Sequence, residues 1–267
     1  MIQAELNGKV PSSLLNSEDL LTSSVIGAFR YLSTPAIIVS ILQNSINLNY
    51  KNFKLSNSLI KQAQYYFWPS LKNSEPDVII LLENADGYFH LVCVEVKYNS
   101  GKSSYEDESV ESIDRKNKER DQLARQFEDL HDSSVYSLFK ITGEKIASTS
   151  LVYLTNDASF PYNDLEESCS FIKKHLNARS NLYWLSWKNF HNEIKKFQNI
   201  ENNQDNLILT DTQRLLERKE LFGFFGFNLN SNVRASAWKY KSNSLFSNWE
   251  ELGDTNKLKW KYRRVKR

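Results

Sequence analysis

The sequence predicts a mixed α/β fold in which helices flank a central sheet. Three observations carry this prediction. Apolar residues recur at helical spacing near the start of the chain. Short apolar or alternating runs, separated by turn residues, follow them. Helical segments then alternate with further apolar runs, which is the order expected when helices pack against a sheet.

The first part of the chain is expected to contain one helix and three strands. Residues 18–32 carry apolar side chains at helical spacing, and Pro35 is expected to end this helix near Ser33. Strands are expected at 64–70, 78–82 and 88–98. The turn signal Asn84-Ala-Asp-Gly87 lies between the last two runs, so these two strands are expected to form a β-hairpin.

The rest of the chain is expected to continue as helices and strands, with one boundary. Helices are expected at 113–130, 162–176, 187–197 and 210–221, and strands at 149–154 and 182–187. The polar stretch 199–206 contains Asn, Gln, Glu and Asp with almost no apolar residue, which is typical of a linker. We therefore expect a core domain over residues 1–200 and a small C-terminal extension over 201–267.

The composition limits the classes of protein that the chain can represent. A formal net charge of +2 excludes a uniformly basic surface but permits local basic patches. Cys93 and Cys169 have no CxxC spacing and no histidine at ligand distance, so neither a zinc site nor a disulfide scaffold is expected. No apolar run approaches the roughly 18 residues that span a membrane, and no signal peptide is recognisable. We expect a cytoplasmic protein without a membrane partner.

The chemistry is concentrated at the open end of the expected hairpin. Asp77, after Pro76, precedes one strand, and Glu95-Val96-Lys97 ends the next. Strand alternation places Glu95 and Lys97 on one face and Val96 on the other. The hairpin can bring Asp77 against the same face. Two carboxylates and a lysine are costly to bury unless they serve a purpose.

Binding of a hard divalent cation would explain why these residues are placed together. Mg²⁺ prefers oxygen ligands, binds few protein carboxylates and keeps waters. We expect Asp77 and Glu95 to be its ligands, with the backbone carbonyl of Val96 as a further one and Mn²⁺ able to substitute. Lys97 could orient an attacking water or neutralise charge that develops on a phosphate.

At these residues the sequence resembles the PD-(D/E)XK nuclease superfamily, which has the restriction-endonuclease-like fold. Pro76-Asp77 matches the first half-motif and Glu95-Val96-Lys97 the second. The order of expected elements over residues 15–160 also resembles the core of that family. The resemblance implies a metal-dependent nuclease with Asp77, Glu95 and Lys97 as catalytic residues. The alternative for such a short motif is a turn aspartate with a surface Glu–Lys pair.

The resemblance extends the site to two expected helices. Many members of the family complete the metal site with an acid of the first helix, and Glu18, ahead of Asp19, matches that position. Some related nucleases carry a Gln-x-x-x-Tyr motif after the second half-motif. Here Gln122 matches, but Gln126 stands in place of the tyrosine. Gln122 and Arg125 are candidate nucleic-acid contacts, and the alternative is a solvated helical face.

The C-terminal end carries a basic and aromatic cluster. The last residues, Lys257–Arg267, contain no acidic residue. Neutralisation of phosphates is the natural use of such a tail, and its aromatic rings could stack on bases. The candidate nucleic-acid contacts here are Lys259, Trp260, Lys261, Arg263 and Arg264. Alternation in the same segment also fits the face of a final strand, and the two readings are compatible.

The sequence thus leads to one expected function and one alternative. The expected function is Mg²⁺-dependent hydrolysis of phosphodiester bonds, with DNA as the substrate, in a bacterial restriction or anti-phage defence setting that the resemblance implies. Partners could be a second copy of the chain, as a homodimer, or an ATPase or other subunit of a complex. The alternative is a non-catalytic nucleic-acid-binding or assembly subunit on the same fold.

Overall fold

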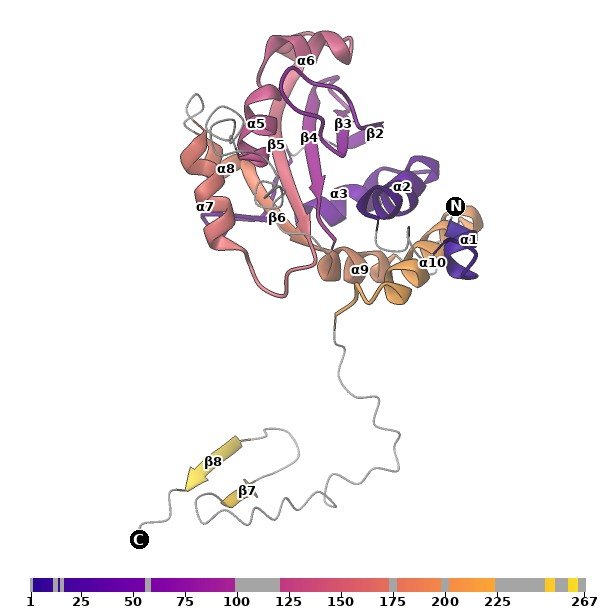
Figure 1. Ribbon diagram of the computed structural model, residues 1–267, viewed down its shortest axis with the longest axis vertical. Helices are drawn as coiled ribbons and strands as arrows, with labels where there is room; N and C mark the ends of the chain where they lie inside the picture. Colours follow the sequence, from indigo (N-terminus) through magenta and orange to yellow (C-terminus); the bar gives the residue numbers. More distant parts are fainter. Residues whose placement is uncertain are drawn as a thin grey trace. The chain divides into compact units, whose positions relative to one another are not determined.

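The chain forms two compact units, Met1–Gly223 and Phe224–Arg267. The computed structural model describes residues 2–11, 14, 17–55, 59–98, 121–172, 177–197 and 202–223, together with the backbone of two strands at 248–252 and 259–263. The first unit is an α/β structure built on a mixed sheet with helices on both faces (Figure 1), as the sequence predicted.

The sheet has six strands in the order β1-β6-β5-β4-β3-β2. The strands are β1 (Ile46–Asn47), β2 (Ile60–Phe67), β3 (Val78–Asn84), β4 (Phe89–Val96), β5 (Ile146–Thr155) and β6 (Leu182–Ser186). Strands β2, β3 and β4 pair antiparallel, whereas β5 pairs parallel with both β4 and β6. The β3–β4 hairpin therefore lies inside the sheet, with β2 on one side and β5 on the other.

One face of the sheet is covered by helices from both ends of the first unit. These are α2 (Glu18–Ala28), α3 (Ala36–Gln43), α9 (Trp187–Lys196) and α10 (Asn203–Arg218). Their buried apolar side chains pack on Val78, Ile80, Val92 and Val94 of the hairpin. Figure 1 shows this group of helices on one side of the strands.

The opposite face is covered by the helices that follow β4. These are α5 (Gln122–Asp129), α6 (Ser133–Leu138), α7 (Tyr162–Phe171) and α8 (Ala178–Asn181). Their apolar side chains pack on Ile79, Leu81, Leu91 and Cys93. Because both faces are covered, β3 and β4 are apolar almost without interruption, as strands buried on both sides must be.

The first predicted helix is present but shorter than expected. The Ser17 side chain accepts the N–H of Leu20 and caps α2, which gives way to a 3₁₀ turn at Phe29–Tyr31. On sequence grounds Pro35 is expected only to end the preceding helix. In the structure Pro35 is also the N-cap residue of α3, an unpredicted helix that begins at Ala36. A proline suits a helix start because it has no N–H to leave unpaired there.

The later elements lie close to their predicted positions. Helices α5 and α7 fall within the segments expected at 113–130 and 162–176, whose residues 113–120 and 173–176 are outside the described residues. Helix α10 begins at Asn203 rather than near 210, because Asn202 caps it. None of the helices described is both long and apolar enough to cross a bilayer.

Helix α10 explains why the first unit continues past residue 200. It packs on α1 (Ile2–Leu6), α2 and α9. Its Leu209, Leu215 and Leu216 belong to the main apolar core. The compact unit therefore ends at Gly223, later than the boundary that the polar stretch 199–206 suggested.

The second unit contains an antiparallel pair of strands, β7 (Asn248–Leu252) and β8 (Lys259–Arg263). Strand β8 agrees with the alternation seen in the sequence near its end. The side chains of Lys259, Trp260, Lys261 and Arg263 are outside the described part of the chain, as is the whole of Arg264. Their expected contacts with nucleic acid stay predictions.

Candidate metal and active site

The open end of the β3–β4 hairpin brings the two predicted carboxylates together. Val78 pairs with Val94, and the same register continued by one residue places Asp77 opposite Glu95. Directly opposed residues of an antiparallel pair lie on the same face. The Asp77 Oδ2 atom accepts the backbone N–H of Val96 at 2.8 Å, so the carboxylate of one strand is fixed to the backbone of the other.

Glu95 is buried, with 1% of its surface exposed, and three side chains donate to its carboxylate. Its Oε1 atom lies 2.9 Å from Lys97 Nζ and accepts Gln122 Nε2 at 2.7 Å. Its Oε2 atom accepts Gln126 Nε2 at 2.6 Å. An ionised carboxylate has about four acceptor positions, so these three donors leave room for one further ligand.

Lys97 is fixed at both its backbone and its ammonium group. Its N–H donates to Leu154 of β5 at 2.8 Å, and its carbonyl accepts the indole N–H of Trp187 at 3.2 Å. Its Nζ lies 3.5 Å from Glu18 Oε2 in addition to its contact with Glu95. The lysine therefore connects Glu95 of β4 to helix α2.

Glu18 reaches this group from the first turn of α2. Its Oε1 accepts the backbone N–H of Tyr98 at 3.3 Å. Its side chain is about a quarter exposed, whereas the adjacent Asp19 is exposed. The structure thus brings Glu18, and not Asp19, to Lys97, so the first turn of α2 lies at the site.

Burial and crowding of the acids perturb the ionisation of Asp77. Burial is the largest cause, the charge of Glu95 comes next and Glu18 adds to it, and together they raise the pKa of Asp77 to about 7. The Val96 N–H and the charge of Lys97 oppose the rise without cancelling it. A cation placed between the acids would relieve this repulsion.

Lys97 stays protonated despite its burial. Burial on its own would lower the pKa of the ammonium group. The charge and hydrogen bond of Glu95, with the charges of Glu18 and Asp77, outweigh that effect and raise the pKa. Lys97 is therefore a fixed positive charge at neutral pH and not a proton acceptor.

Helix α5 supplies a contact that the sequence analysis did not assign. Gln122 and Gln126 lie one turn apart, and each donates a hydrogen bond to a different oxygen of the Glu95 carboxylate. On sequence grounds Gln126 shares a helix face with Gln122 and Arg125, but it departs from the family motif and was not a candidate site residue. Its spacing from Gln122 was the available signal, since residues four apart share a helix face. Arg125 has a buried Nε atom without a hydrogen-bond partner among the described residues and makes no hydrogen bond to the acids.

The donor chemistry fits a hard divalent cation with few protein ligands. Among the described residues, no group of three or more His, Cys, Asp or Glu is arranged to hold a metal ion. Asp77 and Glu95 are instead a pair, and Mg²⁺ is commonly held by one or two carboxylates plus water. The role of the Val96 carbonyl as a further ligand stays a prediction.

Comparison with known proteins identified no relative whose site could be compared with this one. No protein-family model matches the chain, and no curated protein or solved structure matches it. The site therefore has to be interpreted from its own residues.

Proposed function

We propose that this chain is a metal-dependent nuclease with a PD-(D/E)XK-type site. The observation that carries the proposal is the convergence of Asp77, Glu95, Lys97 and Glu18 at one end of the hairpin. Two acids share a strand face, a buried ammonium group stands beside them, and the acids repel one another in the absence of a cation. Such an arrangement lowers stability. Acids whose pKa values are perturbed in this way cluster at functional sites, which supports a role in binding or chemistry.

Each residue has a defined part in the proposed reaction. Asp77 and Glu95 would hold the cation, and Gln122 and Gln126 keep the Glu95 carboxylate in one orientation. When bound, Mg²⁺ would supply an acidic water and neutralise charge on the phosphate. Lys97 provides a permanent positive charge next to that position, which favours the more negative transition state over the ground state.

The substrate is proposed to be DNA, in a restriction or anti-phage defence setting. These two points rest on the family resemblance of the half-motifs at Asp77 and Glu95. The chemistry of the site itself is compatible with any phosphodiester. RNA is accordingly one of the substrates that the experiment must include.

One observation favours the alternative of a non-catalytic nucleic-acid-binding or assembly subunit. Both oxygens of Glu95 already accept hydrogen bonds from side chains of the protein itself. Such donors can hold a carboxylate in a purely structural role, and a cation would have to share its oxygens with them. Under the alternative, the same residues would only stabilise the hairpin.

The experiment compares Lys97→Ala with Lys61→Ala on plasmid DNA, linear duplex DNA, single-stranded DNA and RNA, with Mg²⁺, Mn²⁺ or EDTA. Lys61 is the matched control because its Nζ also lies 2.9 Å from a glutamate, Glu83, on the same hairpin. We expect cleavage that needs the metal, that Lys61→Ala retains, and that falls by about 10²–10³-fold in Lys97→Ala.

Two further results decide between the proposals. Asp77→Asn should abolish cleavage while the folded protein, checked by circular dichroism, is retained. Absence of metal-dependent cleavage in the wild-type protein on all four substrates would overturn the enzymatic proposal. Retained binding to nucleic acid in that case would support the non-catalytic alternative.

A further inference from the structure

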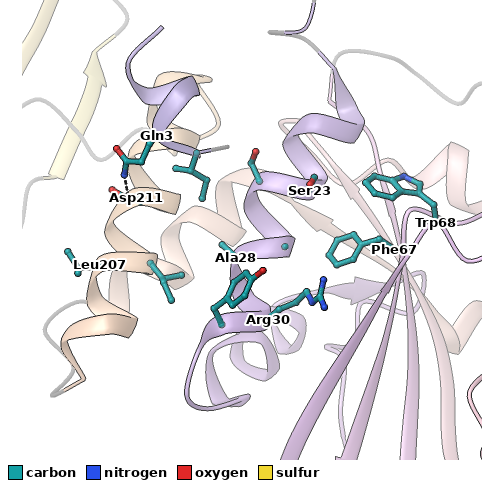
Figure 2. Close-up of a pocket in the computed structure, with 13 residues that line it drawn as sticks. Gln3, Ser23, Ala28, Arg30, Phe67, Trp68, Leu207 and Asp211 are labelled. Atoms are coloured by element: carbon teal, nitrogen blue, oxygen red, sulfur yellow. Dashed lines mark hydrogen bonds between the residues drawn. The ribbon is translucent and has the colours of Figure 1, made fainter. Parts of the chain in front are cut away.

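A groove crosses the outer surface of α2 and has a volume of about 580 Å³. Small residues of this helix form its floor: Ser23, Ser24, Gly27 and Ala28. Figure 2 shows Arg30, Phe67 and Trp68 in a row along one side of the helix, and Gln3, Leu207 and Asp211 on the other. The volume lies within the range of about 300–1,000 Å³ that is usual for small-ligand sites.

The aromatic side of the groove depends on an unusual backbone conformation. Consecutive residues of a strand point to opposite faces of the sheet. Phe67 ends β2, yet its ring and that of Trp68 lie 5.7 Å apart and line the same groove. Trp68 has φ +45°, in the left-handed region that a bulky residue rarely adopts. This turn of the chain places both rings on the α2 side, and strain of this kind is concentrated at functional sites.

Trp68 is also directly connected to the candidate active site. Its N–H donates to the backbone carbonyl of Asp77 at 3.0 Å. Asp77 is in turn bonded through its carboxylate to Val96 of β4. The wall of the groove and the first proposed metal ligand are therefore neighbours across two adjacent strands.

The groove combines open ring surface with a positive charge. Trp68 is 37% exposed and Tyr31, which also lines the groove, is 67% exposed. The guanidinium carbon of Arg30 lies 6.0 Å from the centre of the Phe67 ring. The acidic lining residue, Asp211, is on the far side and accepts a hydrogen bond from Gln3. The aromatic side is therefore suited to flat, electron-rich rings joined to a negative group.

We propose that this groove binds an unpaired segment of the substrate strand next to the cleavage site, with a base stacked on Trp68 and a phosphate beside Arg30. Bases of a duplex are already stacked within the helix, so only an unpaired base can offer its face to the indole. Stacking is tolerant of sequence and charge neutralisation is salt-dependent, so binding should have both properties. The inference rests on the proposed function for the identity of the ligand as nucleic acid.

The test measures binding without cleavage, by fluorescence anisotropy of a short fluorescein-labelled oligothymidylate in EDTA. Trp68→Gly is the main variant because glycine adopts a left-handed backbone without cost, so the fold is kept while the ring is lost. We expect its Kd to rise by about 5- to 100-fold. Trp68→Tyr should restore much of the affinity. Arg30→Ala should weaken binding and reduce its dependence on salt by about one counterion.

Tyr88→Ala is the matched control for loss of an exposed aromatic residue. Tyr88 is 48% exposed and follows the turn at the opposite end of the hairpin. Its removal should leave the Kd unchanged. A duplex of the same length should lose much less affinity than the single strand when Trp68 is replaced.

The outcomes separate this inference from the proposed function. If Trp68→Gly shows metal-dependent cleavage and an unchanged Kd, the proposed binding in the groove is wrong and the proposed nuclease activity still holds. Equal losses for single strand and duplex would also overturn it, since they indicate a general effect on the fold. If the protein binds single strands through Trp68 but cleaves no substrate, the proposed binding in the groove is supported and the proposed nuclease activity is wrong.

Discussion

Each end of the β3–β4 hairpin contributes a glutamate to a Lys–Glu ion pair, and the two pairs have different surroundings. At the turn end, Lys61 Nζ lies 2.9 Å from Glu83, with 53% and 20% of the two side chains exposed. At the open end, Lys97 Nζ lies 2.9 Å from Glu95, with 10% and 2% exposed. The distance is identical, but the pair at the open end is more deeply buried and has additional partners in Gln122, Gln126 and Glu18.

Because the two N–O distances are equal, we expect the surroundings of each pair to decide how much it contributes to stability. Water screens the pair at the turn end, where such contacts contribute about 0–1 kcal/mol. At the open end, α2 and α5 cover the charges, and Gln122 and Gln126 replace the lost water around Glu95. A buried charge without its partner is costly, so neither member can be removed alone without consequence.

The largest expected effect tests this difference directly. Lys97→Met keeps the length of the side chain but leaves Glu95 buried without its countercharge. We expect it to lower the free energy of unfolding by about 3–5 kcal/mol. Lys61→Met should lower it by less than about 1 kcal/mol. Urea denaturation of both variants gives the comparison. Equal losses would show that burial does not distinguish the two ends.

The next effect concerns Asp77 and pH. Its pKa is raised from 3.8 to about 7, so the folded state holds the proton more tightly than the unfolded state. As pH rises above about 4, the unfolded state ionises first, so the folded state loses stability. This loss is complete above about pH 7 and disappears as pH falls to about 4. Asp77→Asn, which cannot ionise, should be more stable than wild type by about 1–3 kcal/mol near pH 8 and equal to it near pH 4.

Addition of Mg²⁺ sharpens the same measurement. A cation that binds the folded protein stabilises it by mass action. We expect Mg²⁺ to raise the melting temperature of the wild-type protein near pH 8 and to leave that of Asp77→Asn unchanged. A stability gain in the variant that is independent of pH would show that ionisation of Asp77 is not its cause.

The smallest expected effect lies at the turn end. Gly87 has φ +78°, and a Cβ atom added there would meet nothing within 4 Å. Gly87→Ala is therefore penalised only by backbone strain, which is about 1 kcal/mol. Thermal melts should show this loss, and cleavage should be unchanged because the open end of the hairpin is not involved. A loss of activity together with stability would mean that the two ends are coupled.

Local signals in the sequence were sufficient for the hairpin and its acids. The turn Asn84–Gly87 and the apolar runs beside it predicted β3 and β4, and the register of these strands then placed Asp77 opposite Glu95. Strand alternation predicted that Glu95 and Lys97 share a face. The expectation that Glu18 joins them came from the family resemblance and not from a local signal; the structure brings Glu18 to Lys97 and Tyr98, and its role as a metal ligand stays a prediction.

Features that depend on contacts between distant segments were not predicted. Helix α3 was missed because Pro35 gave a stop signal and no independent start signal. Gln126 was not assigned to the site because the family motif has a tyrosine at its position, and no local pattern indicates its contact with Glu95, 31 residues away in the chain. The groove beside Trp68 depends on a left-handed residue and on packing between β2 and α2, neither of which has a pattern in the sequence.

The sequence by itself therefore determined which residues can share a strand face, because side-chain direction in a strand follows from backbone geometry. It also determined the sharp turn between β3 and β4, through a glycine that tolerates a positive φ. Only the tertiary structure decided how strongly the acids and Lys97 interact. That strength depends on exclusion of water by α2 and α5, which pack on the hairpin from separate parts of the chain.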